Sequence, residues 1–265
     1  MDLRNSSGIA ACAVGLSLLA LGTGCSKSEA AASAAPMVSS ATPMLASAAP
    51  LAASAAPSAS AASDSNASRM KPYETTVESR LGVLAPNTGI AVGRTVPDGT
   101  LLDLDGKDVT LSSLYKAGPI LLVFYRGGWC PYCNTEIHSL TQAYPEYRKR
   151  GVTPVAVSVD KPEQGAKLKA TYEIPFPVLS DSDAKLMSAF HVNRQVADEE
   201  FGKLKSFGID LESYSGKTHH QMAIPSLFVI DRTGKVLWAH SDPDYKTRPS
   251  TAQLFAAIEA LKLAP

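Results

Sequence analysis

Apolar residues in the C-terminal three quarters of this chain fall into short runs, with longer mixed polar and apolar stretches between them. The runs at 120–125 and 153–159 are continuously apolar or β-branched, which is typical of strands buried on both faces. The stretches at 134–149, 163–172 and 183–190 have helical length and composition, and Asp181 or Ser182 precedes the last of them as a possible cap. Strands that alternate with helices predict an α/β domain with a central sheet covered on both faces.

Further elements surround this pattern. Residues 101–111 predict a hairpin that turns at Asp105-Gly106, because Asp-Gly suits a tight turn between strands. The other predicted elements are a short N-terminal helix at 71–84, a strand at 176–179, a hairpin formed by 226–230 and 235–240, and a last helix at 251–263.

The first residues predict an export signal. The apolar run 8–21 is too short to span a bilayer comfortably and is typical of a signal-peptide core. Leu21-Gly22-Thr23-Gly24 before Cys25 resembles a bacterial lipoprotein cleavage site, with the leucine one place too far from the cysteine. We expect a signal peptide at 1–24, lipidation of Cys25 and a lipid-anchored location on the periplasmic side of the cell envelope. A small-residue cleavage site with an incidental cysteine is the alternative.

Residues 25–69 predict a linker. Ala, Ser and Pro dominate, and a seven-residue repeat begins at Pro36, Pro43, Pro50 and Pro57. A proline in every repeat excludes a continuous helix, and the near absence of charged and aromatic residues leaves nothing to form a core. We expect a disordered tether, followed by one folded domain at 70–265.

Charge and cysteine content narrow the possible chemistry. Lys plus Arg and Asp plus Glu each number 25, so no net charge points to nucleic acid as a partner. Of the four cysteines, Cys12 would be removed with the signal peptide and Cys25 would be capped by lipid. Only Cys130 and Cys133 would remain as thiols. A dithiol outside the cytosol needs a supply of electrons.

The stretch Trp129-Cys130-Pro131-Tyr132-Cys133 is the strongest candidate for chemistry. It follows a predicted buried strand and opens a predicted helix. Backbone N–H groups at a helix start carry partial positive charge and stabilise a thiolate, and Pro131 suits a first turn that needs no N–H. We therefore expect Cys130 to be a reactive nucleophile, with Cys133 one turn further along the helix.

Two other interpretations of the cysteine pair stay open. Cys130 and Cys133 could form half of a zinc site with His219 and His220, although there is no second cysteine pair. They could also form a purely structural disulfide, although so short a loop constrains little of the unfolded chain.

The chain resembles the AhpC/TSA (redoxin) family, a branch of the thioredoxin superfamily that contains the peroxiredoxins. The resemblance covers about 93–263. The hairpin motif at 98–114, the motif Phe-Tyr-Arg-Gly-Gly-Trp-Cys-Pro-Tyr-Cys at 124–133 and the segment Ala-His-Ser-Asp-Pro-Asp-Tyr at 239–245 carry it, the last two resembling a peroxiredoxin-like subgroup. It implies a thioredoxin-like fold with a central mixed β-sheet flanked by helices.

The resemblance also implies roles for two residues near the dithiol. Pro225 follows Ile224 directly before a predicted strand, where thioredoxin-like proteins place a cis-proline beside the dithiol that shapes the substrate groove. A trans proline that starts a strand is the alternative. Arg126 stands four residues before Cys130, so it could lower the pKa of that thiol, or it could be a solvated charge at the strand end.

The active centre departs from that of typical peroxiredoxins. Aligned on the strand before it, Arg126 replaces the usual proline, Cys130 replaces the threonine or serine, and Cys133 falls on the peroxide-reactive cysteine. Pro225 falls on the arginine that typical peroxiredoxins place before the later strand. The chain thus combines a peroxiredoxin-like frame with a thioredoxin-like active centre, and in the peroxiredoxin register Cys133 would attack first.

These features together predict a thiol-dependent antioxidant enzyme without a cofactor. It would reduce peroxides by cycling Cys130 and Cys133 between dithiol and disulfide, with electrons from a thioredoxin-like or membrane reductant. Trp129 and Tyr132 would shield the site and form a docking surface for partners. One alternative is an oxidoreductase that acts on protein disulfides. A second is a metal-binding module in which His220 and Met222 would be the additional ligands.

Overall fold

The computed structural model describes residues 69–263. The predicted signal peptide, the lipidation site at Cys25 and all but the last residue of the predicted tether lie outside the described residues. The central sheet, within the described range, has seven strands in the order β10 (Val236–Ser241), β9 (Ser226–Ile230), β4 (Ile120–Phe124), β5 (Thr153–Ser158), β6 (Val178–Ser180), β2 (Thr100–Leu102) and β3 (Asp108–Thr110).

The sheet is mixed, as predicted. β4, β5 and β6 run parallel, whereas β9, β10, β2 and β3 join them through antiparallel pairings. At the end of β4, Phe124 pairs with Val157 of β5 on one side and with Ser226 of β9 on the other. The two predicted hairpins, β2–β3 and β9–β10, are confirmed, and the Asp231 carboxylate accepts backbone hydrogen bonds within the turn of the second.

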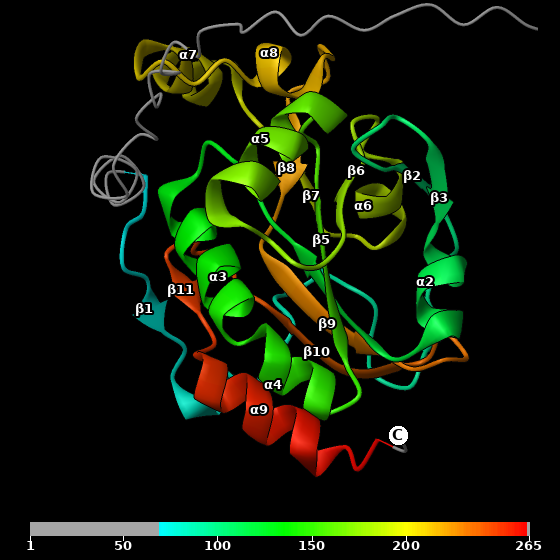
Figure 1. The fold of residues 1–265 in the computed structure, drawn as a ribbon. Helices are drawn as coiled ribbons and strands as arrows, with labels where there is room; N and C mark the ends of the chain where they lie inside the picture. Colours follow the sequence, from blue (N-terminus) through cyan, green and yellow to red (C-terminus); the bar gives the residue numbers. More distant parts are fainter. Residues whose placement is uncertain (1–68, 264–265) are drawn as a thin grey trace, which may run out of the picture. The chain divides into compact units, whose positions relative to one another are not determined.

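Helices cover both faces of this sheet (Figure 1). Along β4, Leu122 and Phe124 belong to one apolar cluster, and Leu121 and Val123 belong to the other, because successive side chains of a strand point to opposite faces. The first cluster contains side chains of α2 (Leu111–Ala117) and α6 (Lys185–Ala189). The second contains side chains of α3 (Pro131–Gln142), α4 (Tyr144–Lys149), α5 (Pro162–Tyr172) and α9 (Thr251–Ala260).

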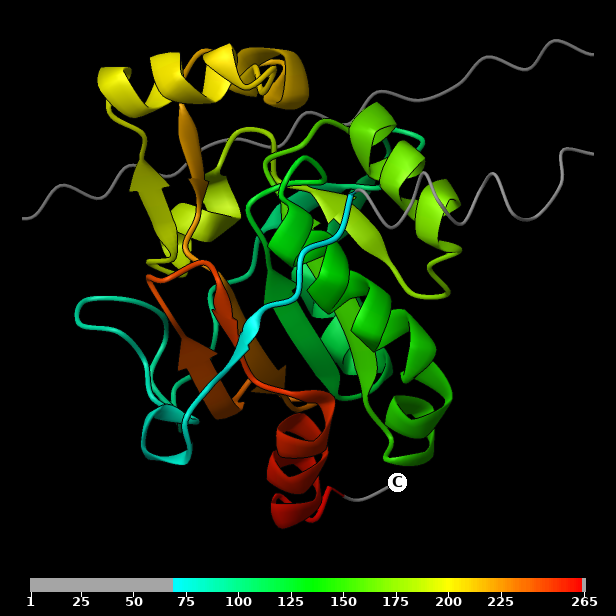
Figure 2. The ribbon, with the colours of Figure 1, turned by 90° about the vertical axis from the view of Figure 1, so that its left-hand side faces the viewer.

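Residues 192–223 form a small module that the sequence pattern did not predict. It consists of β7 (Asn193–Gln195), α7 (Asp198–Ser206), α8 (Leu211–Ser215) and β8 (Gln221–Ala223), and Figure 2 shows its strand pair standing apart from the main sheet. Val196, Leu211 and Met222 make up its own apolar cluster, against which Trp129 packs. We call residues 192–223 the α7–α8 module.

The N-terminal helix predicted at 71–84 is wrong. The chain instead forms β1 (Glu74–Thr75), which runs parallel to β11 (Thr247–Arg248), followed by the short 3-10 helix η1 (Glu78–Arg80). Pro72 and the β-branched residues Thr75, Thr76 and Val77 disfavour a continuous helix here.

The helix predicted at 134–149 is two helices. α3 already begins at Pro131 and ends before Ala143, and α4 begins at Tyr144. Pro145 explains the break, because its ring has no N–H to donate to the preceding turn. At α6 neither Asp181 nor Ser182 is the N-cap residue, which is Ala184, but the Asp181 carboxylate accepts hydrogen bonds from Leu186 N and Met187 N of the first turn at 3.1 and 2.8 Å.

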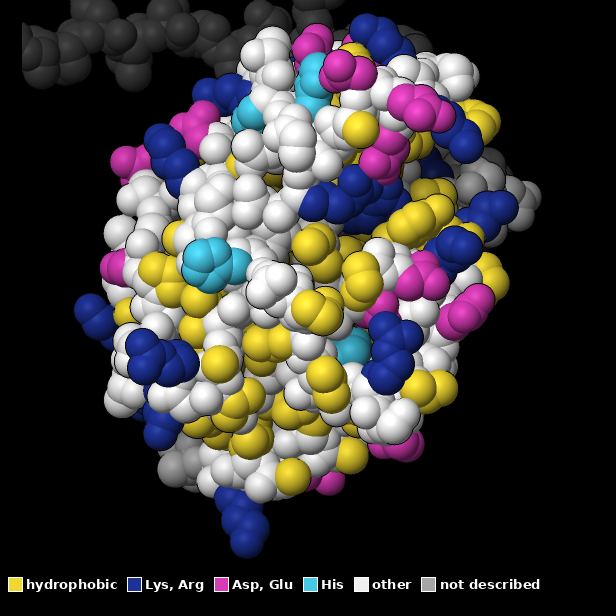
Figure 3. All heavy atoms as spheres, turned by 180° about the vertical axis from the view of Figure 1, so that it is seen from behind, with side chains coloured by type: hydrophobic (Ala, Val, Ile, Leu, Met, Phe, Trp, Pro, Cys, Tyr) yellow, Lys and Arg dark blue, Asp and Glu magenta, His cyan; other side chains and the backbone are white. Residues whose placement is uncertain are grey.

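Some apolar surface stays outside the core. Val77, Val83, Val92 and Phe207 are exposed, and Figure 3 shows hydrophobic side chains gathered over one face of the molecule. No helix within residues 69–263 has the length and apolar content needed to cross a bilayer.

The aromatic core of the first cluster should dominate stability. Phe228 lies 6.1 Å from Phe124 and 5.3 Å from Phe190, measured between ring centroids. We expect Phe228→Ala to lower the free energy of unfolding by about 3–5 kcal/mol, because it leaves a cavity in a packed interior. Phe207→Ala is the matched control, since that side chain is 71% exposed and should change stability by at most about 0.5 kcal/mol. Denaturant titration measures both, and equal losses would contradict this view of the core.

Candidate active site

The two cysteines lie where β4 leads into α3. Cys130 is the N-cap residue of α3, with extended backbone angles, and Pro131 occupies the first turn. The carbonyl of Cys130 accepts the first helical hydrogen bond from Asn134 N at 3.0 Å. Cys133 follows within the first turn. Both thiols are free, and both residues are 0% exposed.

Cys130 has the properties of the more acidic thiol. Its pKa is lowered to about 6, chiefly because Cys133 donates a hydrogen bond to its sulfur, while burial opposes the shift. The positive charge of Arg126 also favours the thiolate, and its Nη1 lies 3.9 Å from Cys130 Sγ. At neutral pH this sulfur is therefore mostly a thiolate.

Cys133 has the opposite character. Burial raises its pKa well above the ordinary range, and the hydrogen bond and negative charge shared with Cys130 raise it further. Arg248, on β11, opposes this increase and places Nη2 at 3.7 Å from Cys133 Sγ. The sequence pattern gave no role to Arg248. Its position three residues before the last helix was the available signal, but no local pattern in the sequence places Arg248 at the dithiol.

Aromatic side chains pack around the guanidinium of Arg126 beside Cys130. The guanidinium carbon of Arg126 lies 4.1 Å from the ring centroid of Tyr245 and 4.8 Å from that of Trp129. Tyr132 packs edge-on against Tyr245, with the ring centroids 5.5 Å apart. All three rings pack against the apolar cluster that contains Cys130, and we define Trp129, Tyr132 and Tyr245 as the aromatic cover.

The α7–α8 module reaches the same arginine. Glu200 on α7 lies 4.0 Å from Arg126 Nη2 and forms a two-point ion pair with Arg194, with distances of 2.6 and 2.8 Å. The sulfur of Met222 accepts hydrogen bonds from Arg126 Nε and Arg194 Nη2, both at 3.3 Å. The module thus balances part of the positive charge beside Cys130.

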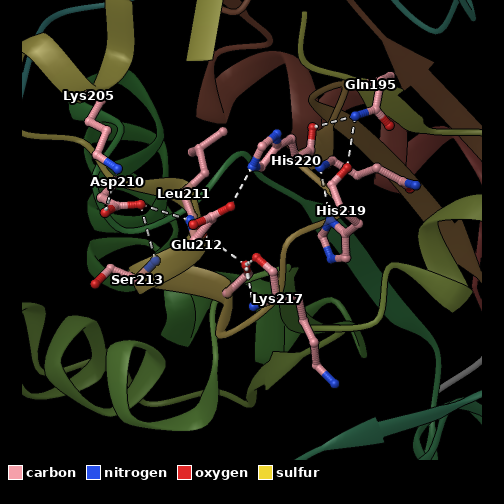
Figure 4. A network of polar contacts seen from close by, with 11 residues as sticks. Gln195, Lys205, Asp210, Leu211, Glu212, Ser213, Lys217, His219 and His220 are labelled. Carbon is pink, nitrogen blue, oxygen red and sulfur yellow. Dashed lines mark hydrogen bonds and ion pairs between the residues drawn. The ribbon is translucent and has the colours of Figure 1, made fainter. Parts of the chain in front are cut away.

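The two histidines that a metal site would need are hydrogen-bonded to other groups of the protein. His220 Nε2 contacts Glu212 Oε1 at 2.8 Å (Figure 4). Its ring also stacks on Phe201. His219 Nε2 contacts the carbonyl of Ser182 at 2.8 Å. Within the described part of the chain, no group of three or more His, Cys, Asp or Glu side chains is arranged to hold a metal ion.

A buried carboxyl group lies behind the dithiol. Asp160 follows β5, and its Oδ2 accepts a hydrogen bond from Gly128 N at 2.6 Å. Burial raises its pKa to about 7, the hydrogen bond from Gly128 opposes the increase, and the charge of Cys133 adds to it. Gly127 permits this approach, since at its φ of +151° an added Cβ would stand 2.8 Å from Asp160 Oδ1.

Pro225 lies at the start of β9, beside the strand that leads to the dithiol. It is buried, and its carbonyl accepts a hydrogen bond from Asp242 N at 3.2 Å. The pairing of Ser226 with Phe124 brings it to the end of β4 from which Arg126 follows. The cis form of its peptide bond stays a prediction.

An open cavity lies at the start of α3, next to Pro131. It has a volume of about 440 Å³, and it is lined by residues of α3 and α5, by Trp129 before α3, by Arg69, and by Ile209 and Tyr214 of the α7–α8 module. Neither Cys130 nor Cys133 lines it. The cavity therefore does not open onto the sulfur atoms.

The acidity of Cys130 can be measured by its rate of alkylation with iodoacetamide as a function of pH. We expect a midpoint near pH 6. Arg126→Met should raise this midpoint by about one unit, because it removes a positive charge beside the thiolate. Arg150→Met removes the same charge from a distant ion pair with Glu146 and Glu259 and should leave the midpoint unchanged. An Arg126 variant with the wild-type midpoint would contradict the assignment.

Asp160 should make stability depend on pH. Its pKa is about 7 in the folded protein against an ordinary value of 3.8, so the folded state keeps a proton that the unfolded state loses. Its contribution to stability is therefore complete below about pH 4 and is lost as the pH rises towards 7. Asp160→Asn should be more stable than the wild type by about 2–4 kcal/mol at pH 8, with little difference at pH 4. Denaturant titrations at both pH values test this, and a pH-independent difference would refute it.

Comparison with known proteins places these features in a family. Residues 92–239 match the model of the AhpC/TSA family. The thiol-disulfide oxidoreductase ResA of Geobacillus thermodenitrificans is 29% identical over 150 residues, which cover 56% of this chain and 68% of ResA.

Two solved structures share the fold. Peroxidoxin BcpB from Mycobacterium tuberculosis aligns with a TM-score of 0.51 and 24% identity, covering 66% of this chain and 97% of that one. Reduced Prx3 from Vibrio vulnificus aligns with a TM-score of 0.53 and 18% identity, covering 64% and 99%. These likenesses confirm the predicted thioredoxin-like fold. Since the family match spans more than half of the sequence, this chain belongs to the AhpC/TSA family.

Proposed function

We propose that this chain reduces disulfide bonds of proteins in the cell envelope, with Cys130 as the attacking thiolate and Cys133 as the resolving thiol. That the chain is an oxidoreductase follows from its family and its relatives. The observation that carries the proposal is the asymmetry of the two sulfur atoms. Cys130 has a pKa of about 6 at the start of α3, whereas burial keeps Cys133 protonated beside it.

The reaction takes place in two exchanges. The Cys130 thiolate attacks one sulfur of the substrate disulfide, forming a mixed disulfide and releasing the other sulfur as a thiolate that takes up a proton. Cys133 then attacks Cys130 Sγ, which forms the Cys130–Cys133 disulfide and releases the second substrate sulfur. The substrate gains two electrons and the dithiol loses two. A thioredoxin-like or membrane reductant must restore the dithiol.

Two features favour a disulfide as substrate. The peroxiredoxin register assigns the first attack to Cys133, but burial raises the pKa of that thiol and leaves it the poorer nucleophile. The aromatic cover of Trp129, Tyr132 and Tyr245 offers apolar surface to a polypeptide at the site of attack. The name of the relative ResA, a thiol-disulfide oxidoreductase, agrees with this choice.

Peroxide reduction is the second candidate, and one observation favours it. Cys130 is fully buried beneath the aromatic cover, and a peroxide reaches such a sulfur more easily than a polypeptide does. Attack of the Cys130 thiolate on the O–O bond would give a sulfenic acid and water or an alcohol. Condensation with Cys133 would then form the same disulfide and release water.

The metal-binding alternative is the weakest. Its additional ligands would be Met222, whose sulfur accepts two arginine hydrogen bonds, and His220, which contacts Glu212. Protection of both thiols from alkylation by stoichiometric zinc or copper would be required to restore it.

The proposed location depends on residues 1–68, which lie outside the described range. We propose that Cys25 is lipidated and that the repeats after it tether the domain to the membrane. The division into signal peptide, tether and a domain at 70–265 remains part of this proposal.

The substrate is tested with the reduced full-length chain carrying Cys12→Ser and Cys25→Ser, so that Cys130 and Cys133 are the only cysteines able to react. We expect rapid reduction of a disulfide-bonded protein such as insulin and a rate with hydrogen peroxide close to that of a free thiol. Cys130→Ser should abolish the reaction, whereas Cys133→Ser should accumulate a mixed disulfide on Cys130, located by mass spectrometry. Fast peroxide consumption with a trapped sulfenic acid would favour the second candidate instead, and a first adduct on Cys133 would overturn the assigned order.

A further inference from the structure

Arg248 is buried against the sulfur that does not attack first. It is 1% exposed, and each of its guanidinium nitrogens has a partner. Nε donates to Glu136 Oε2 at 2.9 Å, Nη1 donates to the carbonyl of Thr247 at 2.7 Å, and Nη2 points to Cys133 Sγ at 3.7 Å. Arg126, the other arginine of the site, instead contacts Cys130.

Burying a guanidinium next to a sulfur atom raises the free energy of the folded state unless an opposite charge balances it. Removing a guanidinium and a carboxylate from water carries a large desolvation penalty, which a buried ion pair repays only with good geometry. Glu136 lies on α3, one turn beyond Cys133, and is itself buried, which raises the pKa of its carboxyl. The carboxylate of Glu136 therefore fixes the guanidinium of Arg248 beside Cys133.

The N-terminal segment helps to fix Arg248 in place. Thr75 of β1 pairs with Arg248 of β11, and Thr76 N donates to the Arg248 carbonyl at 2.8 Å. The preceding residues lie along α3, where Lys71 N donates to the Pro131 carbonyl at 3.2 Å. The segment 71–76 thus contacts both the start of α3 and the backbone of Arg248.

The charge balance around Cys133 changes during the reaction. The titratable groups that act on Cys133 include Cys130 and Glu136 at α3, Tyr125 after β4, Asp160 after β5 and Arg248 on β11, and the backbone of Arg126 donates a hydrogen bond to it. In the reduced protein the Cys130 thiolate raises the pKa of Cys133. Once Cys130 is part of a mixed disulfide, that negative charge is gone. Arg248 is then the nearest positive charge to the thiol that must react next.

We propose that Arg248 is a catalytic residue of the second exchange, in which it stabilises the thiolate of Cys133 as this sulfur attacks the mixed disulfide on Cys130. In that step the Cys133 S–H bond breaks, the Cys130–Cys133 bond forms and the bond from Cys130 to the substrate breaks. The electron pair of that bond leaves on the substrate sulfur, which takes up the proton that Cys133 gave up. Arg126 Nη1 lies at Cys130 and Arg248 Nη2 lies at Cys133, and the charge of Arg248 lowers the pKa of Cys130 only as the smallest of its causes.

This proposal rests on the proposed function, and one experiment separates the two. The full-length chain carrying Cys12→Ser and Cys25→Ser is mixed with 5,5′-dithiobis(2-nitrobenzoate). One thionitrobenzoate is released when Cys130 attacks, and a second is released when Cys133 resolves the mixed disulfide. Stopped-flow absorbance resolves both releases across a range of pH.

Two variants should move the second release in opposite directions. Arg248→Met combined with Glu136→Gln replaces the ion pair by neutral side chains of similar size, and should slow the second release by about tenfold and raise its pH midpoint. Glu136→Gln alone leaves the guanidinium unbalanced beside Cys133 and should lower the midpoint. The rate of the first release should change less than that of the second in both variants, because Arg248 makes only the smallest contribution to the acidity of Cys130.

The outcomes are distinct. A second release with unchanged rate and midpoint in Glu136→Gln, or in the double variant where it folds by circular dichroism, would overturn the role of Arg248. Opposite shifts in the two variants would support it, since a purely structural role predicts slowing in both. If wild-type Cys130 shows no first release faster than a free thiol, the proposed function itself fails.

Discussion

One negative charge on two adjacent buried sulfur atoms is the constraint on which the rest of the site depends. Cys130 and Cys133 share the first turn of α3 and are both removed from water. In such surroundings two thiolates cannot coexist, so ionisation of one raises the pKa of the other. The hydrogen bond from Cys133 and the charge of Arg126 direct the negative charge to Cys130, and burial keeps the proton on Cys133.

The charged side chains that interact with this thiolate come from the ends of separate helices and strands. Arg126 follows β4 and Asp160 follows β5, and because these parallel strands end at the same edge of the sheet, both side chains lie near the dithiol. Arg248 arrives from β11 on a segment held by β1, and Glu200 arrives from α7. The charged residues therefore surround the α3 start, although they are spread over more than a hundred positions of the sequence.

The sequence pattern predicted the parts of this structure that local chemistry determines. The continuous apolar runs identified β4 and β5, the Asp-Gly and Asp-Arg-Thr-Gly turns identified the hairpins, and the cysteine pair identified the α3 start. It did not predict the α7–α8 module, whose small apolar cluster depends on Trp129 from a distant segment. It also gave no role to Asp160, Glu200 or Arg248. Their contacts join residues far apart in sequence, and no local pattern marks an arginine that will be buried against a sulfur atom.

The most direct test of this account follows both cysteines at once. In the reduced wild-type chain, labelled with ¹³C at the cysteine β carbons, an NMR titration reports the ionisation of each thiol separately. The account predicts that Cys130 titrates with a midpoint near pH 6, and that Cys133 keeps its proton well above the ordinary range for a cysteine. Ionisation of Cys133 before Cys130, or equal midpoints near the value of a free thiol, would contradict it.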